Sequence, residues 1–408
     1  MNKYNYIAST LGYIFECYNN VLFGFFAVTL APIFFPENRY ALLSSFGAFA
    51  AGYLTRPIGG TIFGCIGDKY GRRTALMFSV LLAAFPCFVI ALLPSYKSIG
   101  IFAPILLIFA RLLQGISNGG DYSATIIYIA EQKTKTKEFL TCIVVASGFL
   151  GGIVGASIAA LFSLDMFPEN AWRFTFLLGG LMSIAIFLLR QKMDESNAFK
   201  VAQSFGLEQE KITKPSIQAL LSSCILGGAN LVSIYIAIVF INKILLNDLG
   251  VNQTLIFANN SILLVIGLFL VLATSTLMRR FGAEKIMLFS MSYFIVLSVP
   301  VFYFCFYPPL SLFKIFLLQL FIIIGDAPQI AALTYYIPRC FPAKSRCRSL
   351  GISFTMGQAL LGGTTPMLCW LFIDILEFKW APSLLLVFSS VLYILAIVAT
   401  NKHLYTVD

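Results

Sequence analysis

The chain has 408 residues, of which 59% are hydrophobic and only 11% are charged, and its formal net charge is +10. Soluble globular proteins contain about 45–50% apolar and about 25% charged residues, so this composition excludes a soluble enzyme, a disordered chain and a nucleic-acid-binding domain. The apolar residues form long continuous runs, unlike the alternating pattern of a membrane β-barrel. We therefore expect an all-α, polytopic membrane protein.

Six apolar runs precede a polar central segment, and six more follow it. A transmembrane helix needs about 20 apolar residues, so each run is long enough to form one span. We predict twelve transmembrane helices in two six-helix bundles, 1–190 and 216–408, joined by a central cytoplasmic loop at 191–215. The predicted spans are 11–35, 43–66, 74–94, 102–130, 139–163, 174–190, 216–242, 254–277, 286–306, 311–335, 349–375 and 381–400.

The basic residues predict how these spans are oriented. Cytoplasmic loops of membrane proteins carry an excess of Lys and Arg. With the N-terminus inside, 20 Lys and Arg fall in cytoplasmic segments, 6 fall outside, and Arg56 and Arg111 lie within spans. We therefore predict that both termini lie in the cytoplasm. The Phe-rich, Ile-rich and Lys-leaning composition indicates an AT-rich bacterial genome, so we expect a multi-pass protein of the bacterial inner (plasma) membrane.

The cysteines indicate neither a disulfide framework nor a metal site, because the nine of them are scattered and form no CxxC pair. The spans also lack a Ser/His pair, an HExxH motif or a paired-Asp motif. We therefore expect a monomeric non-enzyme without metal or cofactor, whose partners are the lipid bilayer, protons and a small-molecule substrate, with no nucleic acid.

The loop between the second and third spans has the sequence GDKYGRR. Its glycines permit a tight turn, its aspartate can complement a helix N-terminus, and its arginines can pair with carboxylates at neighbouring helix ends. We interpret this loop as a conformational latch, and the alternative is that its basic residues only set topology. The candidate latch residues are Gly67, Asp68, Gly71, Arg72, Arg73 and, at the inner end of the fourth span, Glu131.

This loop resembles the signature of the major facilitator superfamily. The strings RPIGG…GCIGD, from Arg56 to Asp68, and RLLQGISNGGD, from Arg111 to Asp121, are similar to the metabolite:proton symporter branch of that family. This branch includes proline/betaine, citrate, 2-oxoglutarate and shikimate carriers. The resemblance implies two six-helix bundles with a substrate site between them, and transport by alternating access.

Some positions depart from the pattern of the branch. The first span has Glu16-Cys17-Tyr18-Asn19 where the family has Glu-Trp-Tyr-Asp, so one acidic position is neutral. Arg339 stands where a Glu normally precedes Phe-Pro. These differences bear on the substrate and the coupling ratio rather than on the fold.

The fourth span has a polar stripe at helical spacing. Its members recur at i+3 or i+4 and therefore share one helix face. A charge facing lipid at mid-bilayer costs at least about 2.5–3.5 kcal/mol, so we predict that the stripe faces a water-filled central cavity. The alternative is a hydrogen-bonded seam between helices. The stripe comprises Arg111, Gln114, Asn118, Asp121, Thr125 and Tyr128.

A proton-coupled carrier needs a carboxylate that takes up and releases a proton, and a cation that binds substrate. An arginine keeps its charge and binds a carboxylate through two nitrogens. We predict Glu16 or Asp121 as the proton site and Arg56 or Arg111 as the substrate anchor. The alternative is that these four residues form charge-paired structural locks. Further substrate-binding candidates are Tyr18, Asn19, Gln114 and Asn118.

Asp326 is the only deep carboxylate of the second half. It is either a third proton-coupling candidate or the partner of Lys314 or of an arginine. Together with the resemblance to the symporter branch, these residues predict a proton-coupled symporter of a small zwitterion or carboxylate, such as proline, betaine or an organic acid. A proton-driven exporter of hydrophobic compounds and a transport-dead receptor or scaffold are the competing interpretations.

Overall fold

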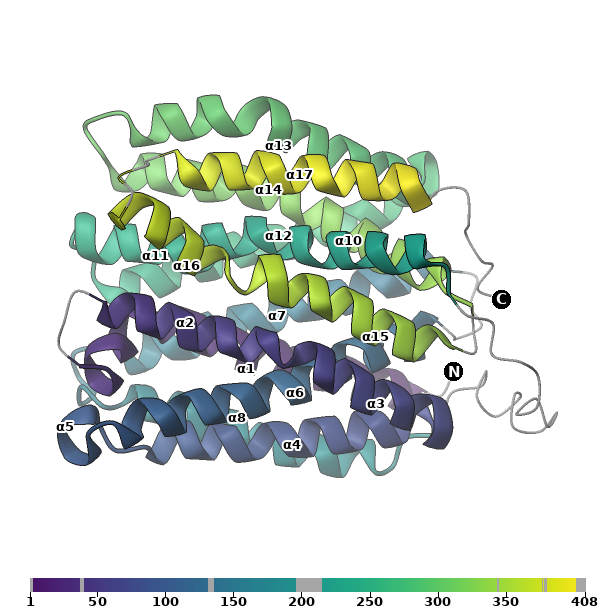
Figure 1. The fold of residues 1–408 in the computed structure, drawn as a ribbon, viewed down its shortest axis with the longest axis horizontal. Coiled ribbons are helices and arrows are strands. Elements are labelled where there is room, and N and C mark those ends of the chain that lie inside the picture. Colours follow the sequence, from purple (N-terminus) through teal and green to yellow (C-terminus); the bar gives the residue numbers. More distant parts are fainter. Residues whose placement is uncertain are drawn as a thin grey trace.

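The structure is a computed structural model that describes residues 3–36, 40–130, 136–195, 215–342, 345–375, 377 and 380–400. Within these ranges it is helical and contains no β-strand, and most helices run along the long axis of the molecule (Figure 1). The first half comprises α1 (Lys3–Phe34), α2 (Ala41–Leu54), α3 (Arg56–Tyr70), α4 (Arg72–Leu92), α5 (Tyr96–Ile99), α6 (Phe102–Ala130), α7 (Lys137–Phe162) and α8 (Trp172–Arg190).

The second half repeats this pattern with several helices that change geometry along their length. Its longest uninterrupted helices are α12 (Gln253–Phe281), α13 (Ala283–Phe306), α14 (Leu312–Tyr336) and α17 (Ala381–Thr400). The remaining elements are α10 (Ile217–Tyr235), η2 (Ile236–Phe240), α11 (Ile241–Lys243), η3 (Ile244–Asp248), η4 (Ile337–Cys340), α15 (Arg346–Gly357), η6 (Gln358–Gly362), α16 (Thr365–Trp370) and η7 (Leu371–Ile375).

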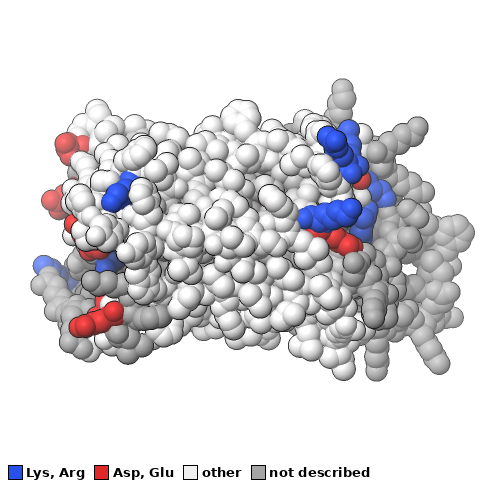
Figure 2. Space-filling view, turned by 90° about the horizontal axis from the view of Figure 1, so that it is seen from above, with Lys and Arg blue, Asp and Glu red and all other residues white. Residues whose placement is uncertain are grey.

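The surface is that of a membrane protein. Eleven helical segments among the described residues are long and apolar enough to cross a membrane. Charged side chains gather near the two ends of the molecule, and an uncharged band separates them on the face shown in Figure 2. Large apolar side chains such as Phe269, Phe289 and Phe313 are exposed at the surface, as lipid-facing residues are. The predicted all-α, polytopic architecture is confirmed.

The second predicted span, 43–66, is two helices rather than one. It breaks at Thr55, between α2 and α3, and Pro57 occupies the first turn of α3. Proline lacks the N–H that a continuous helix would need, but the first turn of a helix tolerates it. At 14 and 15 residues, α2 and α3 are each too short to count among the eleven membrane-length segments. The break places Arg56 at the start of α3, where it is buried.

Two further spans contain π-helical turns. The span that begins with α10 continues through η2, and the span that begins with α15 continues through η6. π-Helical turns occur frequently at functional sites because they displace side chains from the regular helical register. Both of these turns lie beside the cavity described below.

The helices of the two halves form two groups that lie against each other (Figure 1). The main contacts between the groups run along α7 and α12 and along α3 and α15. A Cβ atom on Gly60 of α3 would lie 2.3 Å from the carbonyl oxygen of Gly351 of α15. Small residues allow helix backbones to approach this closely, so this contact depends on glycine.

Gly71 and Gly282 occupy equivalent places in the two halves. They have φ angles of +102° and +84° and separate α3 from α4 and α12 from α13. Glycine adopts positive φ without the steric cost that a side chain would add. The Tyr-Gly and Phe-Gly dipeptides at these two positions therefore mark the same turn in each half.

Candidate functional site

A cavity of about 130 Å³ lies between the two groups of helices. One water molecule needs about 10–15 Å³ of such space, so the cavity has room for a small solute. Its wall combines α1, α3, α6 and α7 of the first half with α10, η2, α12, α14 and η6 of the second. Glu16, Arg56 and Asp326 are the charged residues of this wall.

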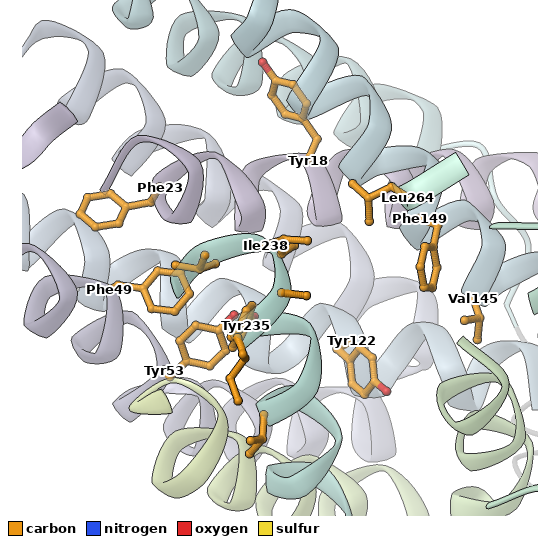
Figure 3. Packing of buried hydrophobic residues seen from close by; sticks show 14 of the residues in the cluster. Tyr18, Phe23, Phe49, Tyr53, Tyr122, Val145, Phe149, Tyr235, Ile238 and Leu264 are labelled. Atoms are coloured by element: carbon orange, nitrogen blue, oxygen red, sulfur yellow. The ribbon is translucent and has the colours of Figure 1, made fainter. Parts of the chain in front are cut away.

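Most of the remaining wall is apolar or aromatic. Figure 3 shows Tyr122, Phe149, Tyr235, Ile238 and Leu264, all of which line the cavity. Three charged side chains in a largely apolar wall are typical of a binding site for a small polar solute.

Aromatic pairs join the two halves on both sides of this cavity. The rings of Tyr53 and Tyr235, on α2 and α10, lie 5.5 Å apart. The rings of Tyr122 and Phe354, on α6 and α15, are stacked with centroids 5.2 Å apart. Tyr53 lies one turn before Arg56, and Tyr122 lies one turn beyond Asn118. One ring of each pair, Tyr235 and Tyr122, also lines the cavity.

Arg56 is the cation of the cavity and binds groups from both halves. Its Nη2 donates to Asn20 Oδ1 at 2.7 Å, and its Nη1 donates to Gln358 Oε1 at 2.9 Å. Its guanidinium carbon lies 3.7 Å from the centroid of the Tyr53 ring. Asn118 also donates to Asn20 Oδ1, at 2.7 Å, so Asn118 reaches the edge of the site.

Neighbouring residues of α1 point in different directions, so the predicted site residues Tyr18 and Asn19 do not face the cavity. Tyr18 donates to the carbonyl of Thr175 at 2.7 Å, and Asn19 donates to Ser183 Oγ at 3.1 Å. Both therefore point toward α8 rather than into the cavity. Asn20, the next residue, faces Arg56, because successive helical residues point about 100° apart. The amide that α1 contributes to the site is therefore Asn20, whereas the predicted substrate-binding residues on α1 were Tyr18 and Asn19.

Glu16 contributes a carboxylate to the cavity wall from α1. It is half-buried, and its Oε2 atom has no hydrogen-bond partner within the described ranges. The Asp121 carboxyl on α6 is an electrostatic neighbour of Glu16. Glu16 is therefore a carboxylate of the cavity wall whose buried Oε2 atom accepts no hydrogen bond from the described residues.

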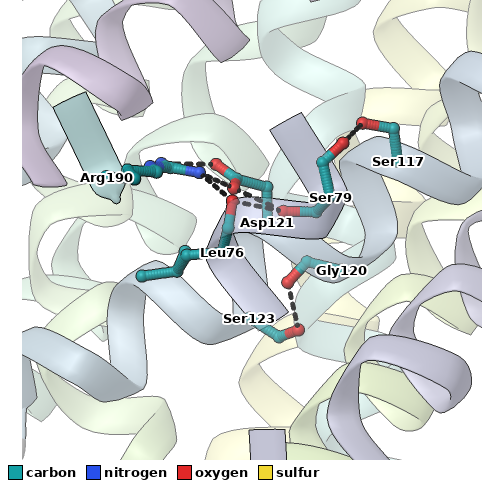
Figure 4. Close-up of polar contacts among 7 residues, drawn as sticks. All are labelled: Leu76, Ser79, Ser117, Gly120, Asp121, Ser123 and Arg190. Carbon is teal, nitrogen blue, oxygen red and sulfur yellow. Dashed lines mark hydrogen bonds and ion pairs between the residues drawn. The ribbon is translucent and has the colours of Figure 1, made fainter. Parts of the chain in front are cut away.

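Asp121 is held in a buried ion pair with Arg190 (Figure 4). Both terminal nitrogens of Arg190 donate to the two carboxylate oxygens. Ser79 Oγ also donates to Asp121 Oδ1, at 2.8 Å, and Arg190 donates to the carbonyl of Leu76 at 2.7 Å. Arg190 ends the predicted span 174–190, and the orientation count places it among the cytoplasmic basic residues. It is the last residue of α8 and is fully buried, so it serves as the partner of Asp121 rather than as an exposed loop charge.

The polar stripe of the fourth span does not line the cavity as a whole. Arg111 donates to Gln114 Oε1 at 2.6 Å, its guanidinium lies over the Phe23 ring, and neither Arg111 nor Gln114 is part of the cavity wall. Gln114 donates to Cys87 Sγ. The expectation that the whole stripe faces water is corrected in favour of the alternative, a hydrogen-bonded seam within the first half.

Asp326 faces the same cavity from the second half. Ser233 Oγ donates to its Oδ1 atom at 2.5 Å. Lys314 donates instead to the carbonyls of Tyr307 and Pro309, so Lys314 is not the partner of Asp326. The cavity therefore has one carboxylate from each half, Glu16 and Asp326.

The GDKYGRR loop makes several contacts at the end of α3. Glu195 accepts from the backbone N–H of Arg72 at 2.8 Å and from that of Arg73 at 3.1 Å. A carboxylate is favourable at this place because the helix dipole is positive at the N-terminus of α4. Arg73 also donates to the carbonyl of Gln191. The expected partner Glu131 lies outside the described residues.

The loop also contacts the second half. Asp68 Oδ2 accepts from the backbone N–H of Arg348 at 3.3 Å, near the N-terminus of α15. Asp68 also lies 3.5 Å from the Arg72 guanidinium. This aspartate therefore links α3 to α15 at the end of the molecule where both chain termini lie (Figure 1).

A second contact between the halves lies at the same end of the molecule. Tyr335 of α14 donates to Glu138 Oε1 of α7 at 2.9 Å. Arg339, the position that departs from the family pattern, donates to the Tyr335 hydroxyl and stacks over the Tyr335 ring. Arg339 stands out in the sequence as a departure from the family pattern. Its pairing with Tyr335 and Glu138 is a tertiary contact that no local pattern predicts.

The fold and the cavity define a class: a multi-pass helical membrane protein with a charged cavity between two helical groups. The chain belongs to the Major Facilitator Superfamily, because the model of that family matches residues 10–366. This finding confirms the resemblance that the sequence motifs indicated.

Individual relatives match nearly the whole chain. The proline/betaine transporter of Salmonella typhimurium is 28% identical over 89% of this chain and 76% of its own length. The glycine betaine/proline/ectoine/pipecolic acid transporter OusA of Dickeya dadantii has the same identity and coverage. A solved structure of the proton:xylose symporter XylE superimposes with a TM-score of 0.78, at 15% identity, over 98% of this chain and 95% of that chain. The structural match supports the fold.

Proposed function

We propose that this protein is a proton-coupled symporter that carries a small zwitterion, such as proline or glycine betaine, or an organic acid. The observation that carries the proposal is the cavity between the halves, where one fixed cation, Arg56, shares a wall with Glu16 and Asp326. The names of the relatives, which are proline/betaine transporters, agree with this substrate class.

Arg56 is the proposed anchor for the substrate carboxylate. A guanidinium binds a carboxylate through two parallel hydrogen bonds, and both terminal nitrogens of Arg56 are directed at oxygen atoms in the site. The positive end of a zwitterion would then meet the carboxylates and the tyrosine rings of the wall, since aromatic faces attract ammonium groups. Arg111, the other candidate anchor, is directed into the seam of the first half.

Glu16 is the proposed proton site, and Asp326 is the second candidate. An acid that couples transport to protons must exchange its proton with the cavity, and Glu16 has an oxygen without a hydrogen-bond partner in the described part of the chain. Asp121 is engaged by both nitrogens of Arg190, which favours the structural-lock alternative for Asp121.

The proposed mechanism is alternating access between the two groups of helices, 1–190 and 216–408, in the bacterial inner membrane. Substrate binding at Arg56 and protonation of the cavity acid would together allow the groups to rock. The latch residues at Gly67–Arg73, with Asp68 of α3 accepting from the Arg348 N–H of α15, would favour one of the two conformations.

Purified protein in lipid vesicles tests this proposal. An imposed pH gradient, acidic outside, is expected to drive accumulation of labelled proline or glycine betaine, and a protonophore is expected to abolish it. A proline/betaine transporter among the relatives serves as the positive control. If the control accumulates substrate and this protein accumulates neither zwitterion nor citrate or 2-oxoglutarate, the proposed function is wrong.

The same vesicles separate the two competing functions. An exporter of hydrophobic compounds would move lipophilic cations but not zwitterions. A receptor or scaffold would bind without flux. Asp68→Asn is expected to reduce flux in a carrier, because it weakens the link to α15, and it would leave a scaffold's binding unchanged.

A further inference from the structure

The terminal nitrogens of Arg56 are both occupied by side-chain amide oxygens. Gln358 Oε1 lies 2.9 Å from Nη1, and Asn20 Oδ1 lies 2.7 Å from Nη2. A carboxylate bound to a guanidinium also presents one oxygen to each of two nitrogens. Each amide oxygen therefore occupies one donor on a nitrogen that a bound carboxylate would also use.

The two amides come from different halves of the protein. Asn20 lies on α1, in the same half as Arg56, and is also held by Asn118. Gln358 is the first residue of the π-helical segment η6, and its backbone carbonyl accepts from the N–H of Gly363 at 2.8 Å. The bond from Arg56 to Gln358 is thus a direct link between the halves in the wall of the cavity.

We propose that Asn20 and Gln358 fill the anion site of Arg56 when it is empty, and that the carboxylate of the substrate replaces both amides. This inference rests on the proposed function, because it requires Arg56 to bind a carboxylate. Replacement breaks the Arg56–Gln358 link, so binding itself releases one half from the other. A solute without a carboxylate cannot displace the amides and would leave the halves joined.

The geometry makes Gln358 a positioning residue, and substitutions of Gln358 should change substrate affinity in a way that distinguishes this role from direct substrate contact. An amide that competes with the substrate weakens substrate binding, whereas an amide that contacts the substrate strengthens it. Gln358→Leu removes the competitor, and Gln358→Glu replaces it with a stronger one, a carboxylate. The two variants should therefore shift affinity in opposite directions, although both remove the native amide.

The experiment measures the affinity of the purified full-length protein for glycine betaine by calorimetry. Gln358→Leu is expected to tighten binding by about tenfold or more, since a hydrogen bond to a charged group is lost from the empty state only. Gln358→Glu is expected to weaken binding by about tenfold or more. If both variants weaken binding, Gln358 contacts the substrate or supports packing, and the inference is overturned.

Hydrogen–deuterium exchange of α3 and α15 tests the link between the halves without any substrate. Gln358→Leu is expected to increase exchange in both segments. The matched control Asn20→Leu also frees one nitrogen of Arg56, but it removes a contact within the first half, so it should leave exchange in α15 unchanged. Equal exchange in the wild type and Gln358→Leu would overturn the proposed link.

These two measurements separate the inference from the function on which it rests. If the wild type binds neither glycine betaine nor proline, the proposed substrate class fails, and the exchange comparison still decides whether Gln358 joins the halves. If the wild type binds glycine betaine but the two Gln358 variants shift affinity in the same direction, the inference alone fails.

Discussion

Single charges inside a membrane protein are costly, so the partner of each buried charge indicates its role. Asp121 and Arg190 neutralise each other through two hydrogen bonds and have further partners in Ser79 and Leu76. Glu16 lies beside this pair with an oxygen facing no donor among the described residues. The first arrangement is that of a structural ion pair, and the second agrees with the proposed role of Glu16 as the proton site.

Replacing Glu16 by glutamine should uncouple transport from protons. We expect Glu16→Gln to reduce gradient-driven accumulation of substrate to the level of empty vesicles, because the side chain can no longer bind and release a proton. Exchange of labelled for unlabelled substrate should continue, because it needs no net proton movement. Asp326→Asn, measured in parallel, shows whether the second carboxylate is also required. Full accumulation by Glu16→Gln would exclude Glu16 as the proton site.

Breaking the Asp121–Arg190 pair should destabilise the protein. Removing one partner leaves an uncompensated buried charge, at a cost of about 3–5 kcal/mol. We therefore expect Asp121→Asn to lower the thermal unfolding temperature in detergent. The double variant Asp121→Asn with Arg190→Gln should recover part of the loss, because neither charge then remains. A single variant as stable as the wild type would contradict the structural role of this pair.

Interruptions in two helices determine where the side chains of Arg56 and Gln358 lie. The break at Thr55 puts Arg56 at the start of α3, and the π-helical turn η6 begins with Gln358. Long helices that remained regular would carry these side chains elsewhere in the register. The contact between α3 and α15, by contrast, joins regular stretches of helix at a distance that only small residues allow.

A side chain at Gly60 should wedge α3 away from α15. Its Cβ would lie 2.3 Å from the carbonyl oxygen of Gly351, and overpacking of this kind costs about 1–3 kcal/mol. We expect Gly60→Val to reduce the uptake rate by about tenfold or more, because the conformation that needs this contact becomes inaccessible.

Gly47→Val is the matched control for this prediction. Gly47 lies on α2, and a Cβ there would meet no atom within 4 Å, so its uptake should stay near that of the wild type. Equal uptake by the two variants would show that the close contact between α3 and α15 is not required for transport.

For the whole molecule, contacts between the two halves occur on both sides of the cavity. Asp68–Arg348 and Tyr335–Glu138 lie at the end that carries the termini. Toward the other end, Gln253 donates to Thr29 Oγ1 at 2.6 Å, which joins α12 to α1. A cavity bounded in this way can open toward either side if one set of contacts breaks while the other holds.

The orientation of the molecule follows from its basic residues and can be measured directly. We expect a protease-sensitive tag at the C-terminus to be cleaved in inside-out vesicles and protected in right-side-out vesicles, because the loops richest in Lys and Arg remain in the cytoplasm. A tag at the N-terminus should give the same result. Cleavage of either tag in intact right-side-out vesicles would contradict the predicted orientation.

The amino-acid sequence by itself determined the class, the family and the positions of the spans. Hydropathy is a local property of about 20 consecutive residues, and motifs such as GDKYGRR are contiguous, so both are readable without tertiary contacts. The same local logic identified Glu16, Arg56 and Asp326 as deep charges.

Only the tertiary structure decided which of these charges share a cavity. Arg111 and Asp121 lie on the same stripe of α6, yet one contacts Gln114 and the other Arg190. Helical periodicity predicts which residues share a face, but it does not predict which neighbouring helix that face contacts. Asn20 and Gln358 are 338 positions apart and meet at one guanidinium. Such contacts depend on how the two halves pack, and no local pattern encodes that geometry.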